Sequence, residues 1–188
     1  MSQYFGVSAD QPDPMRWFVR AAGPGDLPLL VEIERAASQM FRTLGMDLVA
    51  DDDPRPVTEL VPYAECGRAF VATDAADLPV GYLLLDVVDA AAHIEQVSVR
   101  LEDTRKGIGR ALIGRASIWA REHGLDALTL TTYVDVPWNG PYYERLGFRY
   151  LEADEETPAL RALRDKERAL GLDAWPRACM RLKVSFTD

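Results

Sequence analysis

The feature that most constrains this chain is the stretch "VRLEDTRKGIGRALIGRASIWA", residues 99–120. An apolar run ends at Val99, a turn with two glycines and several basic residues follows, and a helical pattern begins at Ile108. The apolar residues of this helix recur every three or four positions, which predicts one buried side. The expected core residues are Ile108, Leu112, Ile113, Ala116, Trp119 and Ala120. The pattern therefore indicates a turn held in place by a rigid, packed helix.

The turn has the composition of an anion site. The N-terminus of a helix presents unpaired N–H groups and a partial positive charge. Gly107 and Gly109 leave the backbone open and permit positive φ angles, which let successive N–H groups converge on one oxygen. Arg105, Lys106 and Arg110 add positive charge. A pyrophosphate fits this design, although a tight turn with exposed basic residues would have the same composition.

Two familiar phosphate loops are excluded. The dinucleotide pattern G-x-G-x-x-G would require glycine at Leu112, and the mononucleotide loop would require Gly-Lys followed by Ser or Thr. The nucleotide-binding folds built on those loops are therefore not supported.

The remaining elements predict one domain that follows a leader. Residues 1–15 contain two prolines and no periodicity, so we expect a leader there and a single domain over 16–188. Strands are expected at 16–22, 68–75, 79–90, 93–99, 127–134, 148–153 and 178–186. Helices are expected at 26–38, 57–66, 108–123, 139–147 and, as a charged insertion, 157–171, with a loop over 39–56. The expected fold class is α/β (α+β), with a mixed, mostly antiparallel twisted sheet of about seven strands flanked by helices.

Charge and cysteine content restrict the partners. The 188 residues carry a net charge of −9, which disfavours nucleic acid and favours cationic partners such as amines. The two cysteines make no disulfide framework, so we expect the reducing cytoplasm and no metal site. We find no signal peptide and no membrane span, and therefore expect no membrane partner.

Two titratable residues precede the turn. Strand alternation predicts that His93, Glu95, Val97 and Val99 share one face, where burial would raise the pKa of Glu95 towards that of a useful base. The alternative is that Glu95 forms a structural pair with an arginine. His93 is the second candidate base, or a residue that lines the pocket.

A short helix is expected at "NGPYYERLG". Asn139 is its predicted N-cap, Pro141 lies in its first turn, and Gly147 ends it. The adjacent rings of Tyr142 and Tyr143 are suited to hydrophobic packing, and we expect one ring in the core and the other at the surface.

The segments "RKGIGRALI" and "YYERLGF" resemble the GNAT superfamily of acyl-CoA-dependent N-acyltransferases, and the order of elements matches over nearly the whole chain. The family loop is Gln/Arg-x-x-Gly-x-Gly/Ala, and Thr104 stands where Gln or Arg is usual. The resemblance implies acetyl-CoA as cosubstrate, Glu95 or His93 as base, and Tyr143 as the acid near the coenzyme sulfur. The implied cofactor-binding residues are Val97, Ser98, Val99, Thr104, Arg105, Lys106, Gly107, Ile108, Gly109, Arg110 and Asn139.

The resulting expectation is an N-acetyltransferase that transfers the acetyl group directly to an amine of a small molecule or peptide. The alternatives are a catalytically silent acyl-CoA-binding module for sensing or assembly, and a protein N-acetyltransferase. The acidic run at Asp51 is expected to be a solvated loop that could guide a cationic amine, and His123 a structural residue at a helix end. A homodimer is compatible with the exposed helix, but no sequence feature specifies one.

Overall fold

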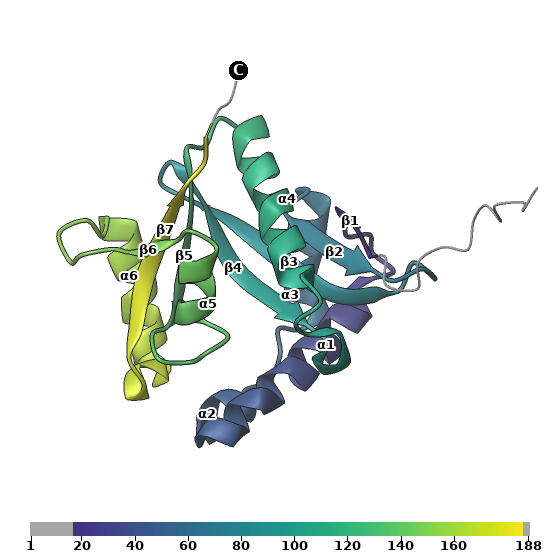
Figure 1. Cartoon of the computed structure of the whole chain (residues 1–188), viewed down its shortest axis with the longest axis horizontal. Helices are drawn as coiled ribbons and strands as arrows, with labels where there is room; N and C mark the ends of the chain where they lie inside the picture. Colours follow the sequence, from purple (N-terminus) through teal and green to yellow (C-terminus); the bar gives the residue numbers. More distant parts are fainter. Residues whose placement is uncertain (1–16, 186–188) are drawn as a thin grey trace, which may run out of the picture.

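The computed structural model describes residues 17–185, which form one seven-stranded sheet with helices on both faces (Figure 1). The strands are β1 (Phe18–Ala21), β2 (Ala69–Thr73), β3 (Pro79–Val88), β4 (Ala91–Val99), β5 (Ala127–Tyr133), β6 (Arg149–Tyr150) and β7 (Arg177–Lys183). Their order in the sheet is β1-β2-β3-β4-β5-β7-β6. All neighbours are antiparallel except β4 and β5, which are parallel. The predicted fold class and strand number are thus confirmed.

The helices divide between the two faces. They are α1 (Leu27–Ser38), α2 (Asp47–Ala50), α3 (Val57–Glu65), α4 (Ile108–Glu122), α5 (Gly140–Arg145) and α6 (Pro158–Ala169), with the short 3-10 helices η1 (Gln39–Leu44), η2 (Leu101–Asp103) and η3 (Leu172–Ala174). In Figure 1, α4 and α5 lie in front of the sheet and α1 and α3 lie behind it. No helix among residues 17–185 is long and apolar enough to cross a bilayer.

Each face of the sheet has its own hydrophobic core. On the α4 face, Leu112 and Trp119 pack with Leu83 and Leu128 of the strands. The buried residues of α4 are the six that the helical spacing predicts, because one side of the helix lies on the sheet throughout its length. On the other face, α1 and α3 pack over β2 and β3 in a second, smaller cluster.

Several sequence predictions need correction. The segment 39–56, expected to be a loop, contains η1 and α2. The charged helix expected over 157–171 ends at Ala169, and Leu170 just after it is 72% exposed. Asp26 occupies the N-cap of α1, but its carboxylate receives the amide of Gly23 rather than one from the helix. The leader 1–15 and Phe186 lie outside the described residues.

Candidate active site

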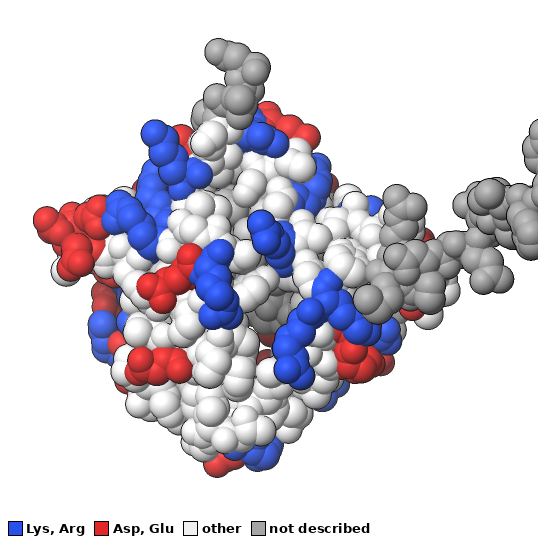
Figure 2. All heavy atoms as spheres, viewed as in Figure 1, with Lys and Arg blue, Asp and Glu red and all other residues white. Residues whose placement is uncertain are grey.

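The sheet forks where its two parallel strands separate. β4 pairs with β5 from Ala91↔Ala127 to Ile94↔Leu130; beyond this point β4 continues to Val99 and β5 to Tyr133 without pairing with each other. The N–H and C=O groups that β4 directs towards β5 are therefore free for a ligand after Ile94. Figure 1 shows the two strands diverging, and the surface in Figure 2 is hollowed at the same place.

A β-bulge at Glu95 marks the start of the fork. Leu84 of β3 pairs with Gln96 and Leu85 pairs with Ile94, so Glu95 has no partner on β3. A bulge inserts one extra residue and shifts the alternation of side chains by one position. The strand β4 shows this shift, because Ile94 before the bulge and Val97 after it both pack into the α4 core.

The prediction that the four alternating residues 93, 95, 97 and 99 share one face of β4 is therefore wrong. Val97 and Val99 face α4, whereas Glu95 contacts Arg55, which directly precedes α3 on the opposite face. His93 also lies away from the α4 core, and it binds Thr129 of β5. Glu95 and His93 thus share a face from which the two valines are absent.

Glu95 is a half-buried carboxylate with one strong partner. Arg55 donates from Nη2 to Oε1 of Glu95 over 2.6 Å, and its Nη1 lies 3.3 Å from Oε2 of Glu59. Burial raises the pKa of Glu95 although the charge of Arg55 opposes the shift. The structural pairing expected as the alternative role is present, and the carboxylate still has the environment of a base with an elevated pKa.

His93 is buried, with 2% of its surface exposed, and Nδ1 lies 2.9 Å from Oγ1 of Thr129. Burial lowers the pKa of His93 to about 4. The imidazole therefore stays neutral near pH 7 and is a weak base, which suits a residue that lines the site.

The glycine turn has the open backbone that its composition predicts. Arg105 and Gly107 have φ angles of 61° and 86°, and Gly107 is the N-cap of α4. The structure shows no hydrogen bond from the amides of residues 105–110 to another residue between 17 and 185. A Cβ on Gly109 would lie 2.8 Å from the hydroxyl oxygen of Tyr142, so a larger residue here would have to displace the Tyr142 ring. The turn thus presents a row of free amides.

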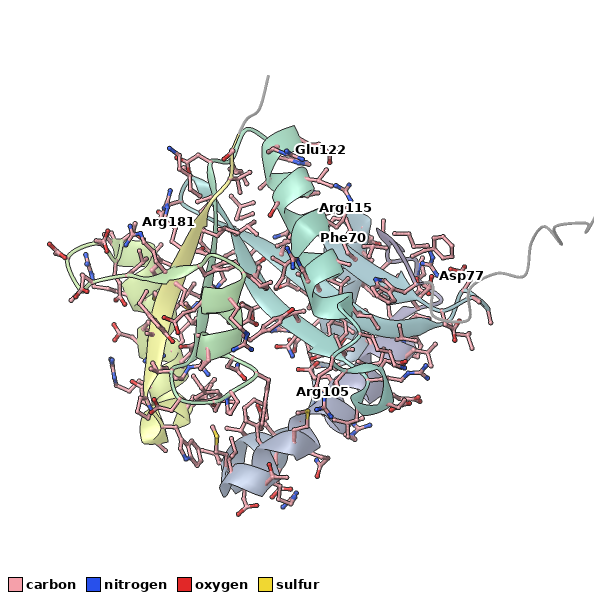
Figure 3. The ribbon with its side chains drawn as sticks, viewed as in Figure 1. Phe70, Asp77, Arg105, Arg115, Glu122 and Arg181 are labelled. Carbon is pink, nitrogen blue, oxygen red and sulfur yellow. The ribbon has the colours of Figure 1, made fainter. Side chains whose placement is uncertain are left out.

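The polar side chains of the turn have different roles. Thr104 donates its hydroxyl proton to the carbonyl of Leu101, so this side chain stabilises η2. Lys106 is 2.8 Å from Asp103, which also pairs with Arg100. Arg105 lies at the N-terminal end of α4 (Figure 3). Figure 2 shows Lys and Arg side chains beside the hollow, which gives the turn the sign of charge that a phosphate requires.

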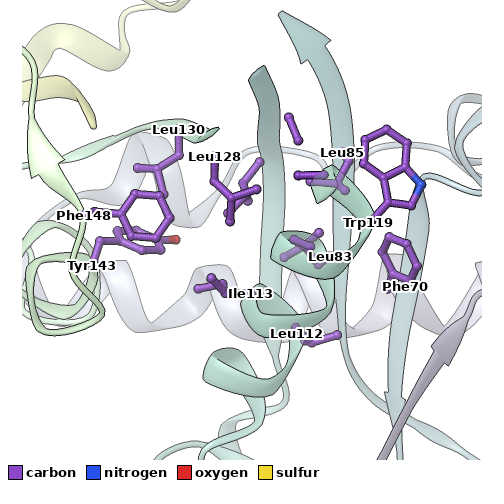
Figure 4. Packing of buried hydrophobic residues seen from close by; sticks show 14 of the residues in the cluster. Phe70, Leu83, Leu85, Leu112, Ile113, Trp119, Leu128, Leu130, Tyr143 and Phe148 are labelled. Carbon is purple, nitrogen blue, oxygen red and sulfur yellow. The ribbon is translucent and has the colours of Figure 1, made fainter. Parts of the chain in front are cut away.

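The two tyrosines of α5 occupy different environments. Tyr143 is buried, its ring centroid lies 5.7 Å from that of Phe148, and burial raises its pKa well above the usual value. Figure 4 shows its hydroxyl pointing in the direction of Ile113 on α4. Tyr142 is only half-buried and covers Gly109. The expected division into a core ring and a ring nearer the surface is confirmed, and the core ring is Tyr143.

Asn139 leaves one buried acceptor without a partner. It occupies the N-cap position of α5, but its side chain makes no capping bond and Nδ2 donates instead to Oγ1 of Thr132 over 3.1 Å. Its Oδ1 is buried and has no hydrogen-bond partner among residues 17–185. Buried acceptors in proteins are usually paired, so Oδ1 fits a ligand N–H on the β5 side of the fork.

Sequence reasoning missed Arg55 and Glu34. Arg55 was in the segment read as a loop, and its contact with Glu95 spans 40 residues of sequence. Glu34 is on α1 and receives the hydroxyl of buried Tyr82 over 2.7 Å. Glu34 could have been found from its place in α1, because it directly follows Ile33 on the side of the helix that is buried. No pattern in the residues next to Arg55 indicates its contact with Glu95.

The comparisons with known proteins agree with this geometry. A family model described as "Acetyltransferase (GNAT) family" matches residues 32–148. This range contains Glu95, the glycine turn, Asn139 and Tyr143.

Three solved structures share the fold. The ribosomal-protein-S18-alanine N-acetyltransferase from Escherichia coli is 17% identical, with a TM-score of 0.63 over 92% of this chain and 97% of that chain. The PaiA N-acetyltransferase from Thermoplasma acidophilum, in complex with coenzyme A, is 15% identical, with a TM-score of 0.67 over 89% and 99%. The N-acetylglutamate synthase from Neisseria gonorrhoeae, complexed with coenzyme A and N-acetyl-glutamate, is 14% identical, with a TM-score of 0.65 over 91% and 36%.

Proposed function

Because the chain belongs to the GNAT acetyltransferase family, we propose that it is an N-acetyltransferase that transfers the acetyl group of acetyl-CoA directly to an amine of a small molecule or peptide. The observation that carries this proposal is the position of Glu95, a half-buried carboxylate on the bulge where the sheet forks. A thioester held in the fork would lie next to this carboxylate. Acetylation of an amine needs such a base, because the amine must lose a proton.

The residues around the fork fit acetyl-CoA. The free amides of the glycine turn suit the pyrophosphate, since a helix N-terminus attracts anions. The unpaired edge of β4 at Val97, Ser98 and Val99 suits the amides of the pantetheine arm, and the orphaned Oδ1 of Asn139 offers an acceptor opposite this edge. When bound, acetyl-CoA supplies the thioester whose carbonyl carbon is attacked.

The reaction requires two proton movements. Glu95 accepts the proton that the amine loses as its nitrogen bonds to the carbonyl carbon, directly or through a water. Tyr143 donates its phenolic proton to the sulfur as the carbon–sulfur bond breaks. The raised pKa of Tyr143 keeps the hydroxyl protonated in the resting enzyme, as an acid requires. The proton on Glu95 then returns to Tyr143 through solvent.

Glu95 is preferred to His93 as the base. Both residues lie on the acceptor side, but burial lowers the pKa of His93 to about 4 and leaves the ring a weak proton acceptor. The shift of Glu95 is in the opposite direction, towards the pH at which the enzyme must work. His93 is therefore assigned to the wall of the site.

Replacement of Glu95 by Gln tests the proposal. General-base catalysis typically contributes about 10²- to 10⁴-fold, so kcat for acetyl transfer should fall by that factor in E95Q. The Kd for acetyl-CoA, measured by calorimetry, should stay within about twofold, because Glu95 does not face the glycine turn. E59Q removes the other carboxylate that contacts Arg55 and is the matched control, with kcat expected to change little. Equal kcat values for E95Q and the wild type would remove Glu95 from the mechanism.

The silent-module alternative has its own test. The protein is mixed with acetyl-CoA and a panel of amino acids, polyamines, aminoglycosides and peptides while free thiol is followed. Amine-dependent release of CoA, with the acetylated amine identified by mass, supports the enzyme. Tight binding of acetyl-CoA without release above the hydrolysis blank would support the binding module instead. Turnover confined to protein amines would favour the protein N-acetyltransferase.

A further inference from the structure

On the face of the sheet that carries Glu95, four arginines are less than a third exposed, and each is paired with a carboxylate. The exposed fraction of the side chain is 29% for Arg55, 26% for Arg68 and 10% for Arg164 and Arg177. Arg55 pairs with Glu95, and Arg68 pairs with Asp86 over 2.7 Å. These two arginines lie towards β3 and α3.

The other two arginines belong to a network that joins α6 to the sheet. Arg177 of β7 donates to Glu167 of α6 over 2.7 Å, and Glu167 also binds Arg164 and the hydroxyl of Thr131. Arg164 reaches Asp173 over 2.6 Å as well. Burial alone would raise the pKa of Glu167, but these hydrogen bonds hold it below its usual value. Both guanidinium groups therefore already form ion pairs with carboxylates of the protein.

Glu34 provides a negative charge that no guanidinium hydrogen bond balances. Its hydrogen bonds come from neutral groups, the hydroxyl of Tyr82 over 2.7 Å and the backbone of Arg55, and the guanidinium of Arg55 acts on it only as a nearby charge. Burial raises the pKa of Glu34. The face that would receive the acceptor thus has half-buried carboxylates at Glu34 and Glu95, while its buried arginines are already paired.

We infer that the acceptor is an amine that has no carboxylate beside its amino group, so that free α-amino acids are poor substrates. The inference rests on the proposed function and names the substrate class of that site. The carboxylate of an α-amino acid is one carbon away from the amine and must enter the site with it. Placed near Glu34 and Glu95 without a free guanidinium, it would be desolvated and would meet like charge. An ammonium without that carboxylate matches the local charge.

Matched acceptor triplets test this inference. For leucine, phenylalanine and valine, kcat/KM is measured for the free amino acid, its amide and its decarboxylated amine. Converting the acid to the amide lowers the pKa of the amine, and decarboxylation raises it, so the two analogues differ from the acid in opposite directions in their fraction of neutral amine. We expect both analogues to exceed the acid by at least about tenfold, which would identify the carboxylate rather than amine basicity as the cause.

The outcomes separate this inference from the proposed function. Turnover in which the free amino acids equal or exceed both analogues would overturn the inference and leave the N-acetyltransferase in place. Turnover in which the amide alone exceeds the acid would also overturn it, because amine basicity would explain the order. If no member of the triplets or of the broad amine panel releases CoA while acetyl-CoA still binds, the proposed function fails and the inference fails with it.

A variant that frees an arginine gives a second test. Glu167→Gln removes the negative charge that both Arg164 and Arg177 contact, so the ratio of kcat/KM between amide and free acid should narrow by several-fold. Glu155→Gln is the matched control, because Glu155 pairs with the exposed Arg149 outside this network and its loss should leave the ratio unchanged. Thermal melting of both variants verifies folding. An unchanged ratio in a folded E167Q would contradict the role of the paired arginines.

Discussion

The two faces of the forked sheet present different chemical groups. On the α4 face, the candidate cofactor site is made of backbone amides and glycines next to an apolar core. On the opposite face, the candidate acceptor site is made of ion pairs between side chains from α6, the strands and the segments on either side of α3. A backbone site depends on φ angles and close approach, whereas an ion-pair site depends on which charges are left unmatched. Ligand binding at the backbone site should therefore be weakened by substitutions that add atoms or alter φ. Binding at the ion-pair site should be altered by substitutions that change charge.

Among the variants that compare the two faces, the largest expected effect comes from the hydroxyl of the buried Tyr143, which points towards α4. Tyr143→Phe keeps the packed ring against Phe148 and removes only the proposed acid. We expect kcat to fall on the order of 10²-fold, the low end for general-acid catalysis because a thiolate is a good leaving group.

The stability of Y143F should stay close to wild type, because no residue between 17 and 185 forms a hydrogen bond with the hydroxyl. Tyr142→Phe is the control on the neighbouring ring. A kcat for Y143F equal to that of Y142F would show that the hydroxyl has no part in proton transfer.

The next effect tests the cofactor face by shape alone. Gly107→Ala forces a Cβ into a backbone with φ of 86°, which costs about 1–2 kcal/mol and displaces the amides of the turn. The Kd for acetyl-CoA should rise about tenfold, while the KM for the amine should change little.

Gly114→Ala is the matched control on the same helix, since no atom lies within 4 Å of its Cβ position. It should leave binding intact and stabilise the fold by about 0.5–1 kcal/mol. Calorimetry and thermal denaturation measure both quantities. An unaltered Kd in G107A would mean that the turn does not grip the cofactor.

The smallest effect tests the acceptor face by charge. Arg55→Gln removes the cation that lowers the pKa of Glu95, while burial, the largest influence, continues to raise it. Since the base must be ionised, the acidic limb of the kcat/KM profile should move to higher pH. The other charged or titratable groups that face Glu95 stay in place in the variant, and they are Asp86, Glu167 and Tyr63.

Arg55→Lys should restore the position of that limb, because it returns the positive charge. In both variants the Kd for acetyl-CoA is expected to remain unchanged. A limb that stays fixed in R55Q, while E95Q abolishes it, would show that Arg55 does not tune the base.

The difference between the two faces also explains what the sequence could predict. The core side of α4 and the positive φ at Gly107 follow from spacing and residue type within one segment. The parallel pairing of β4 and β5 follows from the helix that joins them. These features are local, so a sequence pattern contains them.

The acceptor face could not be predicted in the same way. The contact of Arg55 with Glu95 joins residues 40 positions apart, and the strand register that creates the bulge depends on how β3 and β4 pair. Strand alternation correctly placed His93 and Glu95 together, but it failed for Val97 because one extra residue shifts the pattern. The half-buried side chain of Asn139 likewise donates to Thr132 of β5 instead of capping its own helix, and this contact depends on how α5 packs against β5.

The bulge at Glu95 also constrains how such a chain can change during evolution. Deletion of Glu95 would restore regular alternation with Val97 and Val99 still facing the α4 core, but it would remove the local bend that the extra residue gives to β4. Substitution at this position leaves the strand intact. The carboxylate can therefore be exchanged for another side chain during divergence without a change in the strand, whereas loss of the extra residue would also straighten β4 at the point where the sheet forks.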